Sequence, residues 1–421
     1  MISHQLSNGL RVVAEPIPSA RSVSFGIWVK TGSRFEHPGN NGISHLIEHM
    51  LFKGTERYSA KAIAELFDGI GGNVNAFTSK EYTCYYAKVL DVHLPMAVEV
   101  LADMFFRSLF DEQDLAKEKK VIYEEIAMYE DTPDDYVHDL IAVSAYRDHS
   151  LAYSVLGSED VLASIQPGHI RDYMRQHYFV ENTVISAAGN IPPDFIDLLE
   201  RHFGGFDNHG DDPVSAPPVY YADMQVYPKQ TEQNHICLSL PGLALDDERI
   251  FAMTLLNNVI GGGMSSRLFQ EIREKKGLAY SVYSYHSAHL DSGLFTIYIG
   301  THPSQTGEVL GVAMETLGEL AAGGMTEEEL RRGKEQLKGS MIIGLESTNS
   351  RMNRLGKNEL LLRRHQPLEE VIERIDRVTV NDMNQLIKEM FSHPFSLAMV
   401  GNSDQALSQF RRDPLVLPSS N

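Results

Sequence analysis

The chain has 421 residues, more than one hydrophobic core usually serves, so at least two domains are expected. Its 57 acidic and 37 basic residues give a formal net charge of −20, which argues against a nucleic-acid partner because phosphate binding requires a basic surface. The two cysteines, Cys84 and Cys237, are too few for a disulfide framework or an all-thiolate metal site. The sequence has neither a leader pattern nor an apolar run of about 20 residues, so we expect a cytoplasmic protein without a membrane partner.

Alternating apolar residues predict four strands in the first 90 residues, over 10–15, 22–29, 73–78 and 83–90. Between the second and third of these strands, helical periodicity predicts two helices. The first contains residues 43–52 and ends near Gly54, and the second begins after Ser59, a typical N-cap residue, and ends at the glycines of 69–72. The periodicity is helical again from His93 to about Tyr129, with a break at which Asp111 can cap a new helix.

Two segments of the first half recur in the second half. Residues 183–190 resemble 395–402, and residues 110–115 resemble 325–330, in the same order and at similar offsets. This pattern predicts a duplicated domain of roughly 210 residues. A stretch rich in glycine and proline separates the copies, so the expected organisation is a first domain over 1–208, a linker over 209–228 and a second domain over 229–421.

The segment from Gly42 to Phe52 contains two histidines and a glutamate, His45, Glu48 and His49, among apolar residues. Positions i, i+3 and i+4 share one face of a helix, so the three side chains are expected to project together. Two neutral imidazoles one turn apart can bind one zinc ion at about 2.0–2.1 Å, and the carboxylate between them can accept a proton from an activated water. A buried helix whose histidines only hydrogen-bond to backbone would show the same pattern, so the hypothesis needs a third ligand.

A second predicted helix offers glutamates for that role. Glu124 and Glu125 are adjacent, and Glu118 lies two turns before Glu125 on the same face. One of these carboxylates can bind a metal and another can support the site, although solvated helix glutamates would look the same. The second half has no comparable motif, since Asn257 and Asn258 stand near the corresponding place, so only the first half is predicted to bind the metal.

Taken together, these segments resemble the inverzincin zinc peptidases, the family of pitrilysin, insulin-degrading enzyme and mitochondrial processing peptidase. The resemblance covers essentially the whole chain and is greatest to the short bacterial members. It implies an α+β fold of two homologous domains, each a mainly antiparallel sheet packed with helices, that form half of a clamshell. It also implies one zinc ion per chain on His45, His49 and Glu125, with Glu48 as the general base and Glu118 as a supporting residue.

The resemblance implies three further functional segments. An edge strand to which an extended peptide adds is formed by Asn75, Ala76 and Phe77. Residues 261–267 resemble the family's glycine-rich loop. Arg273 and Tyr280 match its arginine and tyrosine pair, which holds the substrate backbone and stabilises the developing oxyanion. Without the resemblance, these two residues would be interpreted as a surface charge and a core aromatic.

The expected function is therefore that of a zinc-dependent endopeptidase that hydrolyses unfolded peptides. Because the chain would supply only half of a clamshell, we expect a homodimer that encloses a chamber, with each site combining the zinc of one chain with Arg273 and Tyr280 of the other. The alternative is a non-catalytic family member that acts as an assembly or peptide-binding clamp. Such members are expected to have damaged motifs, whereas all the motif residues are present here.

Overall fold

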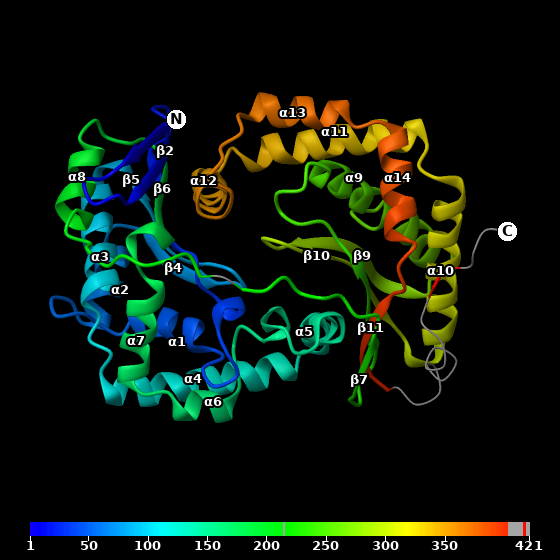
Figure 1. Cartoon of the computed structure of the whole chain (residues 1–421), viewed down its shortest axis with the longest axis horizontal. Coiled ribbons are helices and arrows are strands. Elements are labelled where there is room, and N and C mark those ends of the chain that lie inside the picture. The colour runs from blue at the N-terminus through cyan, green and yellow to red at the C-terminus, as the bar shows by residue number, and fades with distance from the viewer. Residues whose placement is uncertain (214, 403–415, 418–421) are drawn as a thin grey trace. The chain divides into compact units, whose positions relative to one another are not determined.

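The computed structural model describes residues 1–213, 215–402, 416 and 417, which form two compact units (Figure 1). Unit 1 comprises Met1–Ile126, Tyr153–Ser215 and Ile342–His365. Unit 2 comprises Ala127–Ala152, Ala216–Met341 and Gln366–Asn421. Each unit combines helices with one mainly antiparallel sheet, which confirms the predicted α+β fold of two domains.

The sheet of unit 1 has the strand order β1-β2-β6-β3-β5-β4, in which only β2 and β6 run parallel to each other. Its strands are β1 (Ile2–Gln5), β2 (Arg11–Pro16), β3 (Ser22–Val29), β4 (Asn73–Thr78), β5 (Thr83–Leu90) and β6 (Thr183–Gly189). The helices with all or most of their residues in unit 1 are α1 (Ile43–Leu51), α2 (Ala60–Gly69), α3 (Leu94–Arg107), α4 (Glu112–Glu130), α6 (Glu159–Ser164), α7 (Pro167–His177), α8 (Phe195–Phe203) and α12 (Thr348–Leu362). The predicted capping residues act as expected, since Ser59 accepts a hydrogen bond from the amide of Ala62 and Asp111 accepts from the first amides of α4.

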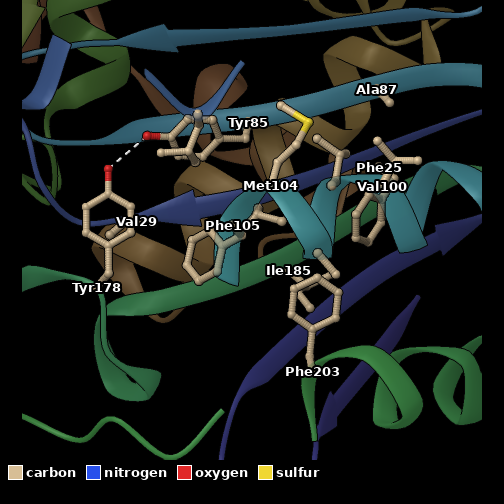
Figure 2. Close-up of a cluster of buried hydrophobic side chains, with 14 of the residues drawn as sticks. Phe25, Val29, Tyr85, Ala87, Val100, Met104, Phe105, Tyr178, Ile185 and Phe203 are labelled. Carbon is tan, nitrogen blue, oxygen red and sulfur yellow. Dashed lines mark hydrogen bonds between the residues drawn. The ribbon is translucent and has the colours of Figure 1, made fainter. Parts of the chain in front are cut away.

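Both faces of this sheet are covered. On one face, Figure 2 shows side chains of α3 packed against Tyr85 and Ile185 of the strands, and the Tyr85 hydroxyl lies 2.8 Å from that of Tyr178. On the other face, α12 packs over β3 and β6. A Cβ at Gly356 of α12 would lie 2.3 Å from Nε1 of Trp28, so only glycine allows this close approach. The central strands β3 and β6 are therefore buried on both sides.

The sheet of unit 2 has the order β7-β11-β8-β10-β9, in which only β7 and β11 are parallel. Its strands are β7 (Met224–Pro228), β8 (Asn234–Pro241), β9 (Ala279–Ala288), β10 (Gly293–Thr301) and β11 (Ser396–Gly401). Its helices are α5 (Pro133–Tyr146), α9 (Ile250–Ile260), α10 (Thr306–Gly323), α11 (Glu327–Gly344), α13 (Leu368–Arg377) and α14 (Val380–Met390). Helices α9, α10 and α14 share a core with one face of the sheet, and Val137 and Ile141 of α5 pack on the other.

The repeated segments occupy equivalent places in the two units. Strands β6 and β11 each run parallel to a neighbour and end at a glycine with positive φ, 134° at Gly189 and 146° at Gly401. The second repeated segment contains the start of α4 in one case and the start of α11 in the other. Helix α4 lies mostly in unit 1, but the helix that follows it, α5, covers the sheet of unit 2. Likewise, α11 lies mostly in unit 2, but the helix that follows it, α12, covers the sheet of unit 1.

The observed units are consequently discontinuous in sequence, whereas the predicted domains, 1–208 and 229–421, are continuous. The apolar face of a helix shows that it is buried but not which sheet buries it, so the sequence pattern could not reveal this exchange. Residues 224–228 of the predicted linker form strand β7. Residue 214 of that linker, and residues 403–415 and 418–421 of the predicted second domain, lie outside the described residues. Within the described part of the chain, no helix is long and apolar enough to cross a bilayer.

Candidate metal centre

Helix α1 presents its chemistry on one face, as its spacing predicts. Leu46, Ile47 and Met50 are at most 1% exposed and pack into the core of unit 1. His45 and His49 are only partly buried, with side-chain exposures of 13% and 18%. The helix therefore fixes its position by its apolar face and leaves the two imidazoles accessible.

The two histidines meet a carboxylate from α4, which also belongs to unit 1. Oε2 of Glu125 lies 3.8 Å from Nε2 of His45 and 3.6 Å from Nε2 of His49. One potential ligand atom from each of the three residues lies within 4.8 Å of the other two. Among the described residues, this is the one group of three or more such side chains with that geometry.

The donor set fits a zinc ion. In a tetrahedral site with bonds of about 2.0–2.1 Å, ligand atoms are about 3.3 Å apart, close to the observed separations. Burial lowers the pKa of His45 to about 3, with a further contribution from the charge of His49, so His45 is neutral at neutral pH, as a metal ligand must be. Lone pairs that converge on one point repel one another, and a cation at that point would relieve the repulsion.

Glu118 contacts the second histidine. Its Oε2 lies 3.2 Å from Nδ1 of His49, and its Oε1 lies 2.7 Å from Nζ of Lys53. A hydrogen bond at Nδ1 leaves the lone pair on Nε2, the atom that faces Glu125. The structure thus places Glu118 beside the three-residue group rather than within it.

Glu48 points to strand β4. The hydroxyl of Thr78 donates a hydrogen bond of 2.5 Å to its Oε2. Burial raises the pKa of Glu48, and the hydrogen bond from Thr78 opposes this effect. Raising a carboxyl pKa moves it toward the range in which a side chain both accepts and returns a proton.

Strand β4 forms one end of the unit 1 sheet and pairs with β5 on one side only among the described strands. Asn75 is exposed, while Ala76 and Phe77 are half-buried. The ring of Phe77 contacts Trp28 edge-on at a centroid distance of 5.7 Å. The strand that the sequence singled out is therefore an edge strand, anchored next to the residue that hydrogen-bonds Glu48.

Arg273 and Tyr280 belong to unit 2. Arg273 lies in a π-helical segment (Phe269–Lys275), and its guanidinium stacks over the ring of Tyr280 at 4.7 Å. Tyr280 is 75% exposed, which excludes the core role that its residue type suggests. In the preceding loop, a Cβ at Gly261 would lie 2.5 Å from the amide of Ser284, so this turn requires glycine.

Two contacts at the site do not follow from the predictions made on the sequence. Thr78 ends the predicted strand over 73–78 and contacts Glu48, and Lys53, which has no predicted role, contacts Glu118. Lys53 lies one turn after His49, so helical spacing could have indicated that it reaches the same carboxylate. No local pattern connects Thr78 to Glu48, because their contact depends on how β4 packs against α1.

Comparisons with known proteins identify the family of the chain. Residues 11–159 match the family model described as "Insulinase (Peptidase family M16)", and residues 164–337 match "Peptidase M16 inactive domain". The chain is 52% identical to the uncharacterized zinc protease YmxG of Bacillus subtilis, over 94% of this chain and 97% of the relative. It is 44% identical to the uncharacterized zinc protease SCO5738 of Streptomyces coelicolor, over 94% and 88% respectively.

Solved structures show the same fold. A peptidase M16 inactive domain structure from Pseudomonas fluorescens aligns with a TM-score of 0.88 at 20% identity, over 96% of this chain and 98% of that chain. A protease from Helicobacter pylori aligns with a TM-score of 0.86 at 23% identity, over 95% and 98% respectively. Together with the family models and the close relatives, these matches show that the chain belongs to peptidase family M16.

Proposed function

We propose that the protein is a zinc-dependent endopeptidase that hydrolyses unfolded peptides. The observation that carries the proposal is that His45 and His49 of α1 converge with Glu125 of α4. A further carboxylate, Glu48, lies on the same face of α1 as the two histidines. A structural zinc site would use a fourth protein ligand, whereas a catalytic site keeps a position open. Names of the close relatives, which call them zinc proteases, support the same conclusion.

The residues of unit 1 would divide the chemistry among them. Zinc bound by His45, His49 and Glu125 would supply Lewis acidity to a peptide carbonyl. Glu48 takes a proton from the attacking water and returns it to the leaving amine. Thr78 holds the Glu48 carboxylate in one orientation during these transfers.

The substrate is proposed to bind as an extended strand along β4, through Asn75, Ala76 and Phe77. Main-chain pairing to an edge strand gives affinity with little demand on side-chain sequence, which suits an enzyme that accepts varied unfolded peptides. Arg273 and Tyr280 are proposed to hold the substrate backbone and stabilise the oxyanion. In a homodimer with a closed chamber, they would act on the zinc site of the partner chain.

Cleavage of a quenched fluorescent peptide tests the activity. The wild type should cleave it, lose activity to a chelator and recover with added zinc. The substitution Glu48→Gln should keep zinc and the fold but lower kcat/KM by about 10²- to 10⁴-fold, the usual contribution of a general base. Undiminished turnover by zinc-loaded Glu48→Gln protein would refute the assignment. A zinc-loaded wild type that binds peptides without cleaving them would instead favour the clamp alternative.

Mixing two inactive variants tests the arrangement in the dimer. A His45→Ala chain paired with an Arg273→Ala chain has one intact site if the two residues act across chains. Random exchange makes about half of the dimers mixed, each with one of two sites intact, so about a quarter of wild-type activity should return. No recovery in dimers shown to have exchanged chains would refute the arrangement.

A further inference from the structure

A buried carboxylate, Glu36, lies at the start of the helix that bears both histidines. Its Oε2 accepts hydrogen bonds of 2.8 Å from the amide of Gly42 and from Nδ2 of Asn41. Its Oε1 accepts a hydrogen bond of 2.9 Å from the amide of Ser44. Glu36 is 6% exposed and lies outside α1, six residues before the N-cap position at Gly42.

The carboxylate replaces the missing cap of α1. Gly42 has no side chain to bind the free amides of the first turn, and these amides carry the positive end of the helix dipole. An anion with two oxygens can bind two amides at once and is attracted by the dipole. Burial raises the pKa of Glu36, while the hydrogen bonds from Gly42, Asn41 and Ser44 oppose this effect.

A glycine contact holds the same turn from the other side. Gly42 has φ of 95°, and a Cβ there would lie 2.8 Å from the carbonyl oxygen of Leu156. A Cβ at Gly157 would lie 2.4 Å from the carbonyl oxygen of Asn41. The backbone at the start of α1 is therefore fixed between a buried carboxylate and a close backbone contact.

The two histidines depend on this turn to different degrees. Glu118 holds His49 through Nδ1. In contrast, Nδ1 of His45 is buried without a hydrogen-bond partner in the described part of the chain. His45 directly follows Ser44, whose amide binds Glu36, so its ring position depends on the backbone of the first turn.

From these contacts we infer that Glu36 is a positioning residue for the metal centre. By capping α1, it places Nε2 of His45 at the distance from His49 and Glu125 that metal binding requires. Glu36 does not contact the ligand side chains and acts through the helix. The inference rests on the proposed zinc site, but it concerns metal affinity and not turnover.

Zinc affinity of the metal-free protein, measured by competition with a chromophoric chelator, tests the inference. The substitution Glu36→Gln keeps the shape but turns an NH2 group toward one of the helix amides. We expect the zinc Kd to rise at least about tenfold, the lower end of the effect of supporting residues around metals. Amide hydrogen exchange at Gly42 and Ser44 should accelerate in the same variant.

Asp103→Asn is the matched control. Asp103 is also a buried carboxylate of unit 1 and is 4% exposed. It accepts hydrogen bonds from Thr55 and Arg107, both of which follow α1 in the sequence, whereas Glu36 precedes this helix. The substitution Asp103→Asn removes similar buried hydrogen bonds but leaves the cap of α1 in place, so the zinc Kd of this variant should stay within about twofold of wild type.

If Glu36→Gln does not fold, Glu36→Asp provides a second variant. It keeps the charge but is too short to reach both amides, so its zinc Kd should change in the same direction.

Unchanged zinc affinity in a folded Glu36 variant, or an equal loss in Asp103→Asn, would overturn the inference. So would a wild type that binds no zinc through His45. A wild type that binds zinc but does not cleave peptides would refute only the proposed function and would leave this comparison of affinities intact.

Discussion

Removing Glu118 should weaken zinc binding without removing a ligand. Its carboxylate is 8% exposed and connects Nδ1 of His49, at 3.2 Å, to Nζ of Lys53, at 2.7 Å. In Glu118→Ala, the imidazole loses the partner that fixes its ring orientation and tautomer. Lys53 is 34% exposed, so its ammonium group can turn to solvent at little cost.

The size of the effect follows from the contact that is lost. A hydrogen bond to a charged group contributes about 1.5–3 kcal/mol, and each 1.4 kcal/mol changes an equilibrium constant about tenfold. Because the contact with Lys53 contributes little to the free energy of zinc binding, most of the loss in Glu118→Ala comes from the hydrogen bond to His49. The zinc Kd of Glu118→Ala should therefore rise about 10- to 100-fold.

Chelator competition with the metal-free proteins at fixed pH and ionic strength provides the measurement. Glu124→Ala is the control, because Glu124 is an exposed glutamate of the same helix α4, next to Glu125. It removes the same charge from α4 without removing the carboxylate that contacts His49, so its Kd should change by less than about threefold. Wild-type affinity in Glu118→Ala would refute the orienting role, and an equal loss in both variants would attribute the effect to charge alone.

Two further predictions concern single hydrogen-bonded groups. Thr78→Val should lower kcat about tenfold with little change in KM, because Glu48 loses the donor that orients it, whereas Thr78→Ser should retain most activity; equal activity of the Val and Ser variants in peptide cleavage would contradict this role. Burial raises the pKa of Glu329, but hydrogen bonds from Arg267 and Thr326 outweigh it and hold the pKa at about 2. Because this value lies below the ordinary 4.5, the carboxylate stabilises the fold above pH 4.5 and loses this effect as the pH falls toward 2. In urea titrations at pH 7, the free energy of unfolding of the wild type should exceed that of Glu329→Gln by about 1–2 kcal/mol, after allowance for solvent screening. A difference of the same size at pH 2 would contradict the low pKa of Glu329.

Local patterns in the sequence determined most of the elements and the core of the candidate site. The spacing of His45, Glu48 and His49 required only that the segment be helical, and the alternation of apolar residues in 73–78 required only a strand. The internal repeat and the missing motif at Asn257 and Asn258 also showed that the two halves differ in chemistry. Each of these features is visible as a short pattern within the sequence, so one chain is enough to reveal it.

Only the tertiary structure decided which distant groups meet. On residue type alone, Glu124 and Glu125 were equivalent, and the packing of α4 against α1 turns Glu125 to the histidines. The buried cap at Glu36 and the exchange of α5 and α12 between the sheets were invisible for the same reason. A side chain's type and spacing show that it seeks a partner, but the partner is chosen by contacts between segments far apart in the sequence.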